Sequence, residues 1–301
     1  MPDQMSDQPY AVTVPYYSAP DYLRLTLDSV VAQTDPSWWC VVVDDSPDDS
    51  AAAVVAAVGD DRITVERNPT TLGVAGNFNR CVDLAAERGA ELGMILHADD
   101  LLEPTYVSTM RAAHARRPQA ACVAPRVTVV DAAGTPYLPM PDRVKAALWP
   151  RRLECLEGER GLQLLLRGQF FYCPAVSYRW ALLERPAWDA RWRQVMDLML
   201  YGRVILGGGS VELEPTRVFR YRRHAASETQ QNSATLSRTE EETAACRELA
   251  AAAGALGWRR ARRAGLARTT VRLQSMLQAV LALARGRFAL ALRATRLGLR
   301  P

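Results

Sequence analysis

Short runs of β-branched residues alternate with longer stretches of helical period over residues 10–130, and this alternation constrains the fold more than any other feature. It is typical of βαβ units, in which parallel strands are joined by helices that cover the sheet. The continuous run Val41, Val42 and Val43 indicates a central strand covered on both faces. The sequence predicts strands at residues 11–15, 39–43, 63–66, 94–96 and 121–124, with helices between them.

After Asp131 the regular pattern ends, since four prolines punctuate residues 136–150. We expect an irregular connection over residues 131–160, too long for an ordinary loop and therefore functional. Beyond Ser233 the whole sequence is typical of helices. Between these parts we expect a helix at 161–167, a β-like stretch at 175–178, a helix at 194–206 and strands around Val211 and Phe219.

At 301 residues and 49% hydrophobic, the chain is able to bury a large core. Its six cysteines are scattered and show no zinc-ligand spacing, which favours a reducing compartment without structural zinc. The polar, acidic residues 1–9 predict a flexible N-terminal segment without the features of a signal peptide. Since no apolar stretch approaches the roughly 18 residues that a membrane span needs, we expect a cytoplasmic protein.

The charge of the chain is divided unevenly. The 12 arginines and one acid from Arg247 onward give that tail a charge of +11, and the remaining 25 basic and 32 acidic residues leave −7 for the body. An apolar stripe on residues 273–284 is flanked by arginines. An anionic membrane surface, the acidic body or a partner protein would each fit such a helix. Nucleic acid would not, since the acidic body repels its backbone.

Acidic side chains follow two of the predicted strands. Asp44 and Asp45 come after residues 39–43, and Asp99 and Asp100 come after residues 94–96. Ligands of open α/β sheets bind beyond the carboxyl ends of the strands, where such carboxylates suit Mg²⁺ or Mn²⁺ beside a phosphate-bearing substrate. The alternative is that Asp45, Ser46 and Asp48 only start the helix at Ser50, and that Asp99 or Asp100 caps the helix opened by Pro104.

Five segments in order resemble the family 2 glycosyltransferases, the inverting group with the GT-A fold. The segments are residues 12–17 (VTVPYY), residues 28–34 (DSVVAQT), residues 41–46 (VVVDDS), the loop with Asn68, Gly73, Asn77 and Asn79, and residues 96–100 (LHADD). Where that family commonly has an arginine and an acid, this sequence has Phe78 and His97. The resemblance implies an α/β, GT-A mixed sheet flanked by helices over residues 10–232, with a basic helical C-terminal extension at 233–301.

The resemblance also implies roles for individual residues. Asp45 would accept the imide N–H of uracil or thymine, and Pro15 and Tyr17 would line the base pocket. Asp99 would hold the ribose or assist the metal, and Asp100 would bind the Mg²⁺ or Mn²⁺ that bridges the diphosphate. Residues 10–130 would form the nucleotide-sugar-binding half, to which Asn79 also belongs, and residues 131–232 the acceptor-side half.

Asp197 resembles the catalytic base of that family, and a charge in so apolar a helix start is costly without a purpose. The alternative is that Asp197 caps its helix. The upstream Trp188 and Trp192 would either stack on an acceptor sugar or pack in the core. The segment 219–224 resembles a family segment near the donor diphosphate, in which Arg223 would contact the nucleotide sugar and His224 the metal; an exposed basic loop is the alternative.

These residues predict an inverting, metal-assisted transferase that moves a sugar from a UDP- or dTDP-sugar donor to a glycan, a lipid-linked intermediate or a small molecule, in the cytoplasm or on the inner face of the plasma membrane. A non-catalytic nucleotide-sugar-binding scaffold of the same fold is the first alternative. A nucleotidyltransferase fits less well, because the chain has a single lysine, Lys145, and no glycine- and lysine-rich phosphate loop after its first strand.

Overall fold

A computed structural model of the chain describes residues 8–224 and 236–299. Residues 1–7, 225–235 and 300–301 are outside the described part, and with them lie most of the predicted N-terminal segment and the predicted boundary between residues 232 and 233. Within the described residues, no helix is long and apolar enough to cross a membrane.

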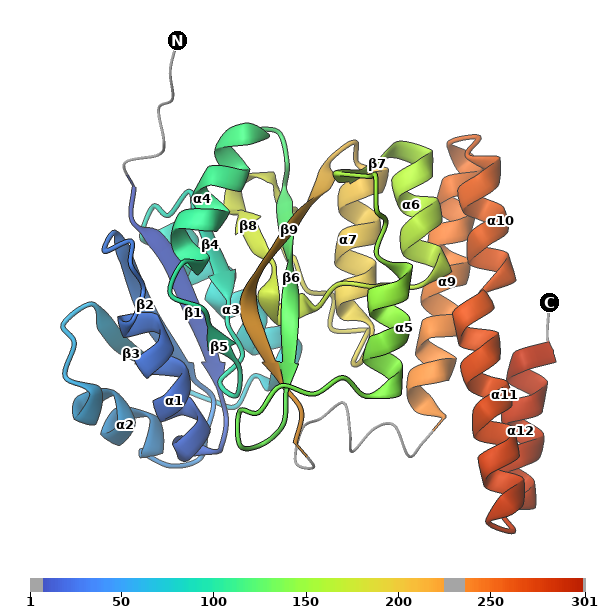
Figure 1. Ribbon diagram of the computed structural model, residues 1–301, viewed down its shortest axis with the longest axis horizontal. Helices are drawn as coiled ribbons and strands as arrows, with labels where there is room; N and C mark the ends of the chain where they lie inside the picture. The colour runs from blue at the N-terminus through green and yellow to red at the C-terminus, as the bar shows by residue number, and fades with distance from the viewer. Residues whose placement is uncertain (1–7, 225–235, 300–301) are drawn as a thin grey trace.

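One mixed sheet of nine strands forms the centre of the molecule (Figure 1). Its strands follow the order β3-β2-β1-β4-β8-β6-β9-β5, and β7 pairs with β9 outside this path. The first four are parallel neighbours, β8 is antiparallel to both β4 and β6, and β9 is parallel to β6. The strands are β1 (Tyr10–Tyr16), β2 (Trp38–Asp44), β3 (Ile63–Arg67), β4 (Leu92–Ile95), β5 (Leu101–Leu102), β6 (Cys122–Val130), β7 (Cys155–Glu157), β8 (Ser177–Arg179) and β9 (Ser210–Arg222).

Helices cover both faces of this sheet because its central strands alternate apolar residues to both sides. Val42 packs on one face with residues of α1 (Pro20–Val31), α2 (Ser50–Val58) and α4 (Tyr106–Arg116). Val41 and Val43 pack on the other face, with α3 (Gly73–Glu87), α6 (Gly158–Arg167) and α7 (Met196–Leu206). The strand is therefore covered on both faces, as its β-branched run predicts, but it is not central in the sheet, because β2 is the neighbour of the edge strand β3.

The region 131–160, which the sequence analysis expected to be irregular, contains α5 (Met140–Leu148) and strand β7. The prolines misled that prediction, because Pro139 is the N-cap of α5 and Pro141 lies in its first turn, where proline is tolerated. The two strands expected around Val211 and Phe219 are one strand, β9, which crosses both positions with an irregular register against β6.

Four helices follow residue 235, as the sequence predicts: α9 (Ser237–Ala255), α10 (Arg259–Ala267), α11 (Thr269–Ala284) and α12 (Phe288–Leu299). α9 packs on α7, and α10 packs on α6 and α9. The close approach of α10 depends on Gly265, where an added Cβ would meet the Cys246 carbonyl at 2.8 Å. α11 and α12 pair with each other and extend from the edge of the molecule opposite α2 (Figure 1).

Candidate active site

The two acidic segments meet at one edge of the sheet because their strands flank β1 in parallel. β1 pairs with β2 on one side and with β4 on the other. The carboxyl ends of β2 and β4 therefore point the same way, and Asp44 and Asp45 at one end lie on the same edge as Asp99 and Asp100 at the other. The structure thus brings the two predicted acidic segments to the same edge of the sheet, where ligands of open α/β sheets bind.

Asp45 is a buried carboxylate whose two oxygens are occupied by donors of this chain. Oδ1 accepts hydrogen bonds from the Asn68 side-chain amide at 2.9 Å and from the Leu72 N–H at 2.8 Å, and Oδ2 accepts one from the Gly73 N–H at 2.9 Å. It thereby fixes the loop after β3 and the start of α3. This holding role is absent from the sequence analysis, and the role of Asp45 in reading a base stays a prediction.

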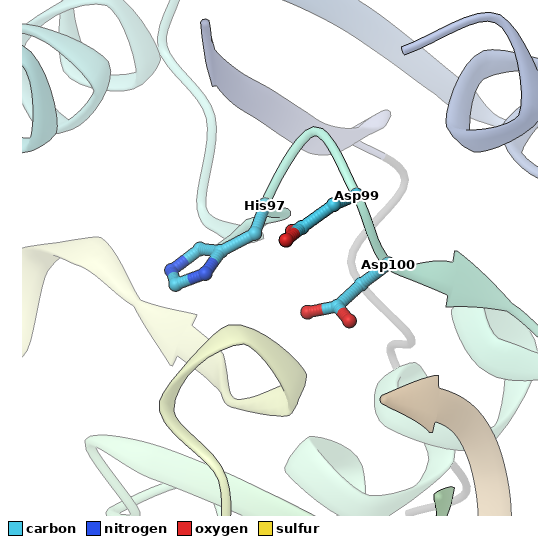
Figure 2. A group of neighbouring side chains, drawn as sticks. All are labelled: His97, Asp99 and Asp100. Atoms are coloured by element: carbon cyan, nitrogen blue, oxygen red, sulfur yellow. The ribbon is translucent and has the colours of Figure 1, made fainter. Parts of the chain in front are cut away.

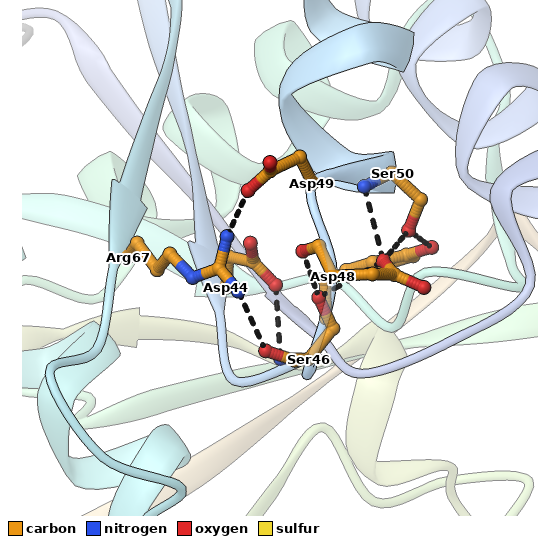
Figure 3. Close-up of polar contacts among 7 residues, drawn as sticks. Asp44, Ser46, Asp48, Asp49, Ser50 and Arg67 are labelled. Carbon is orange, nitrogen blue, oxygen red and sulfur yellow. Dashed lines mark hydrogen bonds and ion pairs between the residues drawn. The ribbon is translucent and has the colours of Figure 1, made fainter.

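The start of α2 is held by another residue. Asp48 accepts hydrogen bonds from the Ser50 N–H at 3.0 Å and from the Ser50 hydroxyl at 2.6 Å, and Asp44 accepts one from the Ser46 N–H at 2.9 Å (Figure 3). Of the three residues that the helix-start alternative named, Asp48 performs that task and Asp45 does not. Asp44 shapes the turn between strand and helix.

Asp100 is almost completely buried, with 1% of its surface exposed. Its Oδ1 accepts a hydrogen bond from the Arg222 N–H of β9 at 2.7 Å, whereas Oδ2 has no hydrogen-bond partner among the described residues. Burial, followed by the charge of Asp99, raises the pKa of Asp100 well above its ordinary value. Neither acid caps α4, whose N-cap is Thr105 with no side-chain cap hydrogen bond, so the capping alternative is wrong here.

Asp99 stays the more acidic of the pair. Burial alone would raise its pKa, but the hydrogen bond that His224 Nε2 donates to Asp99 Oδ2 at 2.8 Å holds the pKa below its ordinary value. The Asp99 carbonyl oxygen also accepts a hydrogen bond from Arg222 Nε at 2.8 Å. One carboxylate that ionises readily therefore lies beside one that burial keeps from ionising.

His97, Asp99 and Asp100 form a cluster of metal-ligand type (Figure 2). One ligand atom from each lies within 4.8 Å of the others. His97 Nε2 is buried without a hydrogen-bond partner among the described residues, and burial lowers the pKa of His97, which keeps the ring neutral. Two carboxylates and a neutral imidazole with bare donor atoms fit a divalent cation, and Mn²⁺ accepts nitrogen more readily than Mg²⁺. The alternative of a hydrogen-bonded His97 finds no support at Nε2.

The predicted ligand His224 lies behind this cluster, where its ring contacts Asp99. It is not part of the three-residue group, and its role as a metal ligand stays a prediction. A histidine that forms a hydrogen bond with a metal-binding carboxylate orients that carboxylate.

Asp197 lies in the first turn of α7, whose N-cap is Val195, and its Oδ1 accepts a hydrogen bond from the Leu198 N–H at 2.9 Å; the residue is therefore not the N-cap, although it does bind a free N–H at the start of the helix. Its Oδ2 accepts a hydrogen bond from Gln169 Nε2 at 2.6 Å, and its negative charge raises the pKa of His97, although burial of that ring dominates. The acid is half-buried and within electrostatic range of the metal-type cluster. Its role as the catalytic base stays a prediction.

Arg222, Arg223 and His224 are three consecutive residues at the end of β9 that hold three acids. Arg223 forms a bidentate ion pair with Asp142 of α5, with Nε–Oδ2 at 2.7 Å and Nη2–Oδ1 at 2.8 Å. The exposed-loop alternative for this segment is wrong, because Arg222 is buried and Arg223 and His224 are half-buried. Contact of Arg223 with a donor stays a prediction.

Two residues of this site, Asp142 and Lys145, were missed because both lie on the unexpected helix α5. Asp142 is 1% exposed and also accepts a hydrogen bond from the Tyr172 hydroxyl at 2.6 Å. Lys145 Nζ lies 4.1 Å from the centre of the Tyr172 ring, and burial, followed by the charge of Arg238, lowers the pKa of Lys145 to about 8. The signal available in the sequence was that Lys145 is the single lysine of the chain.

A family model for glycosyl transferase family 2 matches residues 11–183, more than half of the chain. The chain belongs to this family. It is a glycosyltransferase. No curated protein matches it.

Solved structures similar to this family 2 enzyme show its fold. S. aureus TarS 1-349 aligns with a TM-score of 0.62 and 14% identity over 96% of this chain and 90% of that one. The complex of TarS 1-349 with UDP-GlcNAc aligns with a TM-score of 0.60 and 14% identity over 96% and 91%. The mannosyltransferase PcManGT from Pyrobaculum calidifontis, in complex with GDP-Man and Mn²⁺, aligns with a TM-score of 0.58 and 18% identity over 98% and 88%. The fold is the GT-A glycosyltransferase fold, as predicted.

The remaining predicted donor contacts of the family 2 enzyme occupy different surroundings. Pro15 is half-buried in β1 beside Val43, and Tyr17 is 59% exposed just after the strand. Asn79 uses both ends of its side-chain amide on the backbone of Trp188, at 2.8 and 2.9 Å, next to a pocket of about 310 Å³. The structure thus gives Asn79 a task in joining α3 to that segment, and donor contact stays a prediction for all three.

The tryptophans before α7 are packing residues. Trp188 is 1% exposed and Trp192 is 8% exposed, and both belong to the main core. The Trp188 ring lies edge-on to Phe78, and Phe78 in turn contacts the His97 ring at 5.4 Å between centres. The two departures from the family pattern, Phe78 and His97, are therefore neighbours, and the phenylalanine ring forms an apolar wall beside the imidazole.

Proposed function

We propose that this family 2 enzyme is an inverting transferase that uses a nucleotide-sugar donor and a divalent cation, Mg²⁺ or Mn²⁺. Its donor would be a UDP- or dTDP-sugar, and its acceptor a hydroxyl of a glycan, a lipid-linked intermediate or a small molecule. The observation that carries the proposal is the bare, buried Oδ2 of Asp100 in the His97, Asp99 and Asp100 cluster. A buried carboxylate oxygen without a donor is costly unless a ligand completes it.

The donor type has additional support. The solved structures of the same fold contain UDP-GlcNAc in one case and GDP-Man with Mn²⁺ in another. A nucleoside diphosphate linked to a sugar is their shared chemistry. The binding half, residues 10–130, would hold the nucleotide through Pro15, Tyr17, Asp45 and Asn79, and the half at 131–232 would face the acceptor.

In the proposed site, Asp100 and Asp99 hold the cation, and His224 either completes that ligand set or orients Asp99. The cation, when bound, neutralises charge on the diphosphate. Arg223 keeps N–H donors beyond the two that Asp142 occupies, and these would contact the diphosphate oxygens. Because its partner Asp142 lies on α5, the same ion pair joins the donor side to the helix that faces the acceptor.

Asp197 would act as the base. The acceptor hydroxyl oxygen attacks the anomeric carbon from the face opposite the diphosphate, and its proton passes to an Asp197 oxygen. The bond from the anomeric carbon to the diphosphate oxygen breaks, and the nucleoside diphosphate leaves with the bonding electrons. Gln169, which donates to Oδ2 at 2.6 Å, holds the carboxylate in one orientation for this transfer.

We further propose that the enzyme works in the cytoplasm, at the inner face of the plasma membrane. A lipid-linked acceptor would be found there, and all six cysteines are free thiols, which fits a reducing compartment. Residues 233–301 would then be an extension that serves location, while residues 10–232 perform the chemistry.

The test compares Asp100→Ala with Asp197→Asn, using calorimetric titration with UDP and Mn²⁺ and an assay of donor hydrolysis and transfer. We expect Asp100→Ala to lose Mn²⁺-dependent UDP binding. Asp197→Asn should keep that binding and lose turnover by roughly 100- to 10,000-fold, the usual contribution of a general base. Wild-type turnover in either variant would remove its assigned role. A wild-type protein that binds no UDP at millimolar concentration would favour the non-catalytic scaffold.

A further inference from the structure

The helical hairpin formed by α11 and α12 has its small residues inside and its large apolar residues outside. The positions buried between the helices and against α9 include Ser275, Ala279 and Ala282 of α11 and Ala291 and Ala294 of α12. The exposed large residues are Leu273 (66%), Leu277 (59%), Val280 (62%), Leu281 (43%), Leu283 (52%), Phe288 (72%), Leu292 (53%) and Leu299 (67%). A hairpin that stays in water normally has the reverse arrangement.

Close contact of the two helices requires this arrangement. At Gly298 an added Cβ would meet the Met276 Cε at 2.9 Å and the Ser275 Cβ at 3.4 Å, so no larger residue fits there without movement. Small residues at the contact and large apolar residues outside are the pattern of helix pairs in membranes, where the surroundings are as apolar as the side chains. The stripe that the sequence analysis identified at residues 273–284 is therefore exposed and does not pack on the acidic body.

The neighbouring helix α10 has a mostly charged outer face, in contrast to the hairpin, although it exposes Leu266 (39%). α10 has four exposed arginines at residues 259–263, and it buries Ala261, Ala264 and Gly265 against the body. It therefore has a covered small-residue face and a charged outer face, as a helix in water should. The hairpin replaces that charged outer face by leucine, valine and phenylalanine.

Charge identifies the occupant of this apolar surface. Residues 269–299 contain five arginines and no acid. Arg285 and Arg287 are exposed in the turn between the helices, beside the exposed Leu283 and Phe288. Arginines at the rim of an apolar surface match an anionic lipid layer, in which side chains enter the acyl boundary and guanidinium groups contact phosphates. A second copy would instead bring two positive surfaces together.

We propose that the α11–α12 hairpin docks the protein on an anionic membrane by inserting the outer face of Leu277, Val280, Leu281 and Phe288 into the lipid interface. The hairpin lies in the interface and does not cross, because the 16 residues of α11 span only about 24 Å, less than the roughly 30 Å of a hydrocarbon core. Contacts with α9 hold the hairpin to the body. Arg293 pairs with Glu240 at 2.7 Å, and the Thr239 hydroxyl bonds to the Gln278 side-chain oxygen at 3.2 Å.

The test uses the full chain in flotation with vesicles of phosphatidylcholine alone and of phosphatidylcholine with about one third phosphatidylglycerol, the anionic lipid. We expect binding to the anionic vesicles only. Leu277→Gln combined with Val280→Gln should weaken it at least ~10-fold, since each removes apolar area from the lipid contact. Arg285→Gln combined with Arg287→Gln should weaken it roughly 10-fold, and added salt should weaken the wild type.

Leu25→Gln is the matched control, because Leu25 is a 46% exposed leucine on α1, away from the hairpin. It should bind vesicles like the wild type. Failure of the wild-type chain to float with anionic vesicles would overturn the proposal. So would a dimer in light scattering that Leu277→Gln dissociates, since a second copy would then cover the face. UDP binding with Mn²⁺, measured without vesicles in every variant, reports separately on the proposed catalytic site.

Discussion

Asp45 and Asp100 are both buried carboxylates that follow parallel strands at the same edge of the sheet, yet their surroundings are opposite. Asp45 receives three hydrogen bonds from the loop and helix that it positions. Asp100 receives one, from the Arg222 N–H, and keeps its second oxygen bare. The first carboxylate is completed by the fold, and the second is left for a ligand to complete. Similar sequence patterns thus precede one carboxylate whose two oxygens both accept hydrogen bonds from the fold and one that has an oxygen without a partner among the described residues.

The largest difference should appear in metal-supported nucleotide binding. Asp100→Asn removes the carboxyl group that would bind the cation and should reduce UDP affinity in the presence of Mn²⁺ by roughly 100-fold or more, because replacing a residue that only orients a metal ligand already costs about 10- to 100-fold. Calorimetric titration with and without EDTA measures it. The comparison would break if Asp100→Asn bound UDP and Mn²⁺ as the wild type does.

Asp45→Ala should act mainly on stability. It leaves the Leu72 and Gly73 N–H groups and the Asn68 amide without their acceptor, so we expect the free energy of unfolding to fall by about 3 kcal/mol in urea denaturation. Asp45→Asn keeps one acceptor oxygen and should lose less. Asp100→Asn should be neutral or stabilising in the same assay without metal, because it removes a charge that burial disfavours. A loss for Asp45→Ala no larger than that for Asp100→Asn would contradict the comparison.

Mn²⁺ should stabilise the native protein through Asp100 and not through Asp45. At a free concentration one hundred times its dissociation constant, a ligand that binds only the native state adds about 2.7 kcal/mol. Thermal unfolding should therefore shift upward with Mn²⁺ in the wild type and in Asp45→Asn, but not in Asp100→Asn. An equal shift in all three proteins would place the cation elsewhere.

The smallest effect is the pH dependence of the metal-free protein. Because burial raises the pKa of Asp100 above its unfolded value, the native state binds the extra proton between those two pKa values. Protonated Asp100 therefore contributes its full stabilisation below about pH 3.8, and this contribution is lost as the pH rises through the native pKa. Over that range the free energy of unfolding changes by about 1.4 kcal/mol per pH unit for one proton. In EDTA, the wild type should gain stability relative to Asp100→Asn as pH falls from 7 towards 4.5. A difference that stays constant over this range would refute the raised pKa.

The sequence predicts the sheet edge and its acids well because the information is local. A β-branched run followed by acids, as in residues 41–45, places carboxylates after a buried strand without knowledge of the rest of the chain. Asp197 likewise stands out as a charge in an apolar helix start. The hydrogen bonds that Asp45 accepts are not predictable in this way, because their donors, Asn68, Leu72 and Gly73, lie more than twenty residues further along the chain.

Two other features were missed for different physical reasons. The prolines near residue 140 predict an irregular connection, but Pro139 and Pro141 lie at positions where proline starts a helix. The sequence therefore does not reveal Asp142 and Lys145 as site residues. In the tail, the apolar stripe of α11 is compatible with three contacts: a membrane surface, the acidic body or a partner protein. The small residues Ser275, Ala279 and Ala282, which recur at the same helical spacing, were the sign that this stripe faces outward.

The end of β9 links the candidate site to strand register. Arg222, Arg223 and His224 reach Asp100, Asp142 and Asp99, which come from separate parts of the chain. β9 passes Arg126 with an irregular register. Inserting or deleting one residue of β9 in that stretch would shift every following residue by one position and turn it to the opposite side. All three contacts would then be lost together. Point substitutions there should be tolerated one at a time, whereas a single-residue length change should abolish the site. In related sequences, the length of this stretch should therefore vary less than its composition.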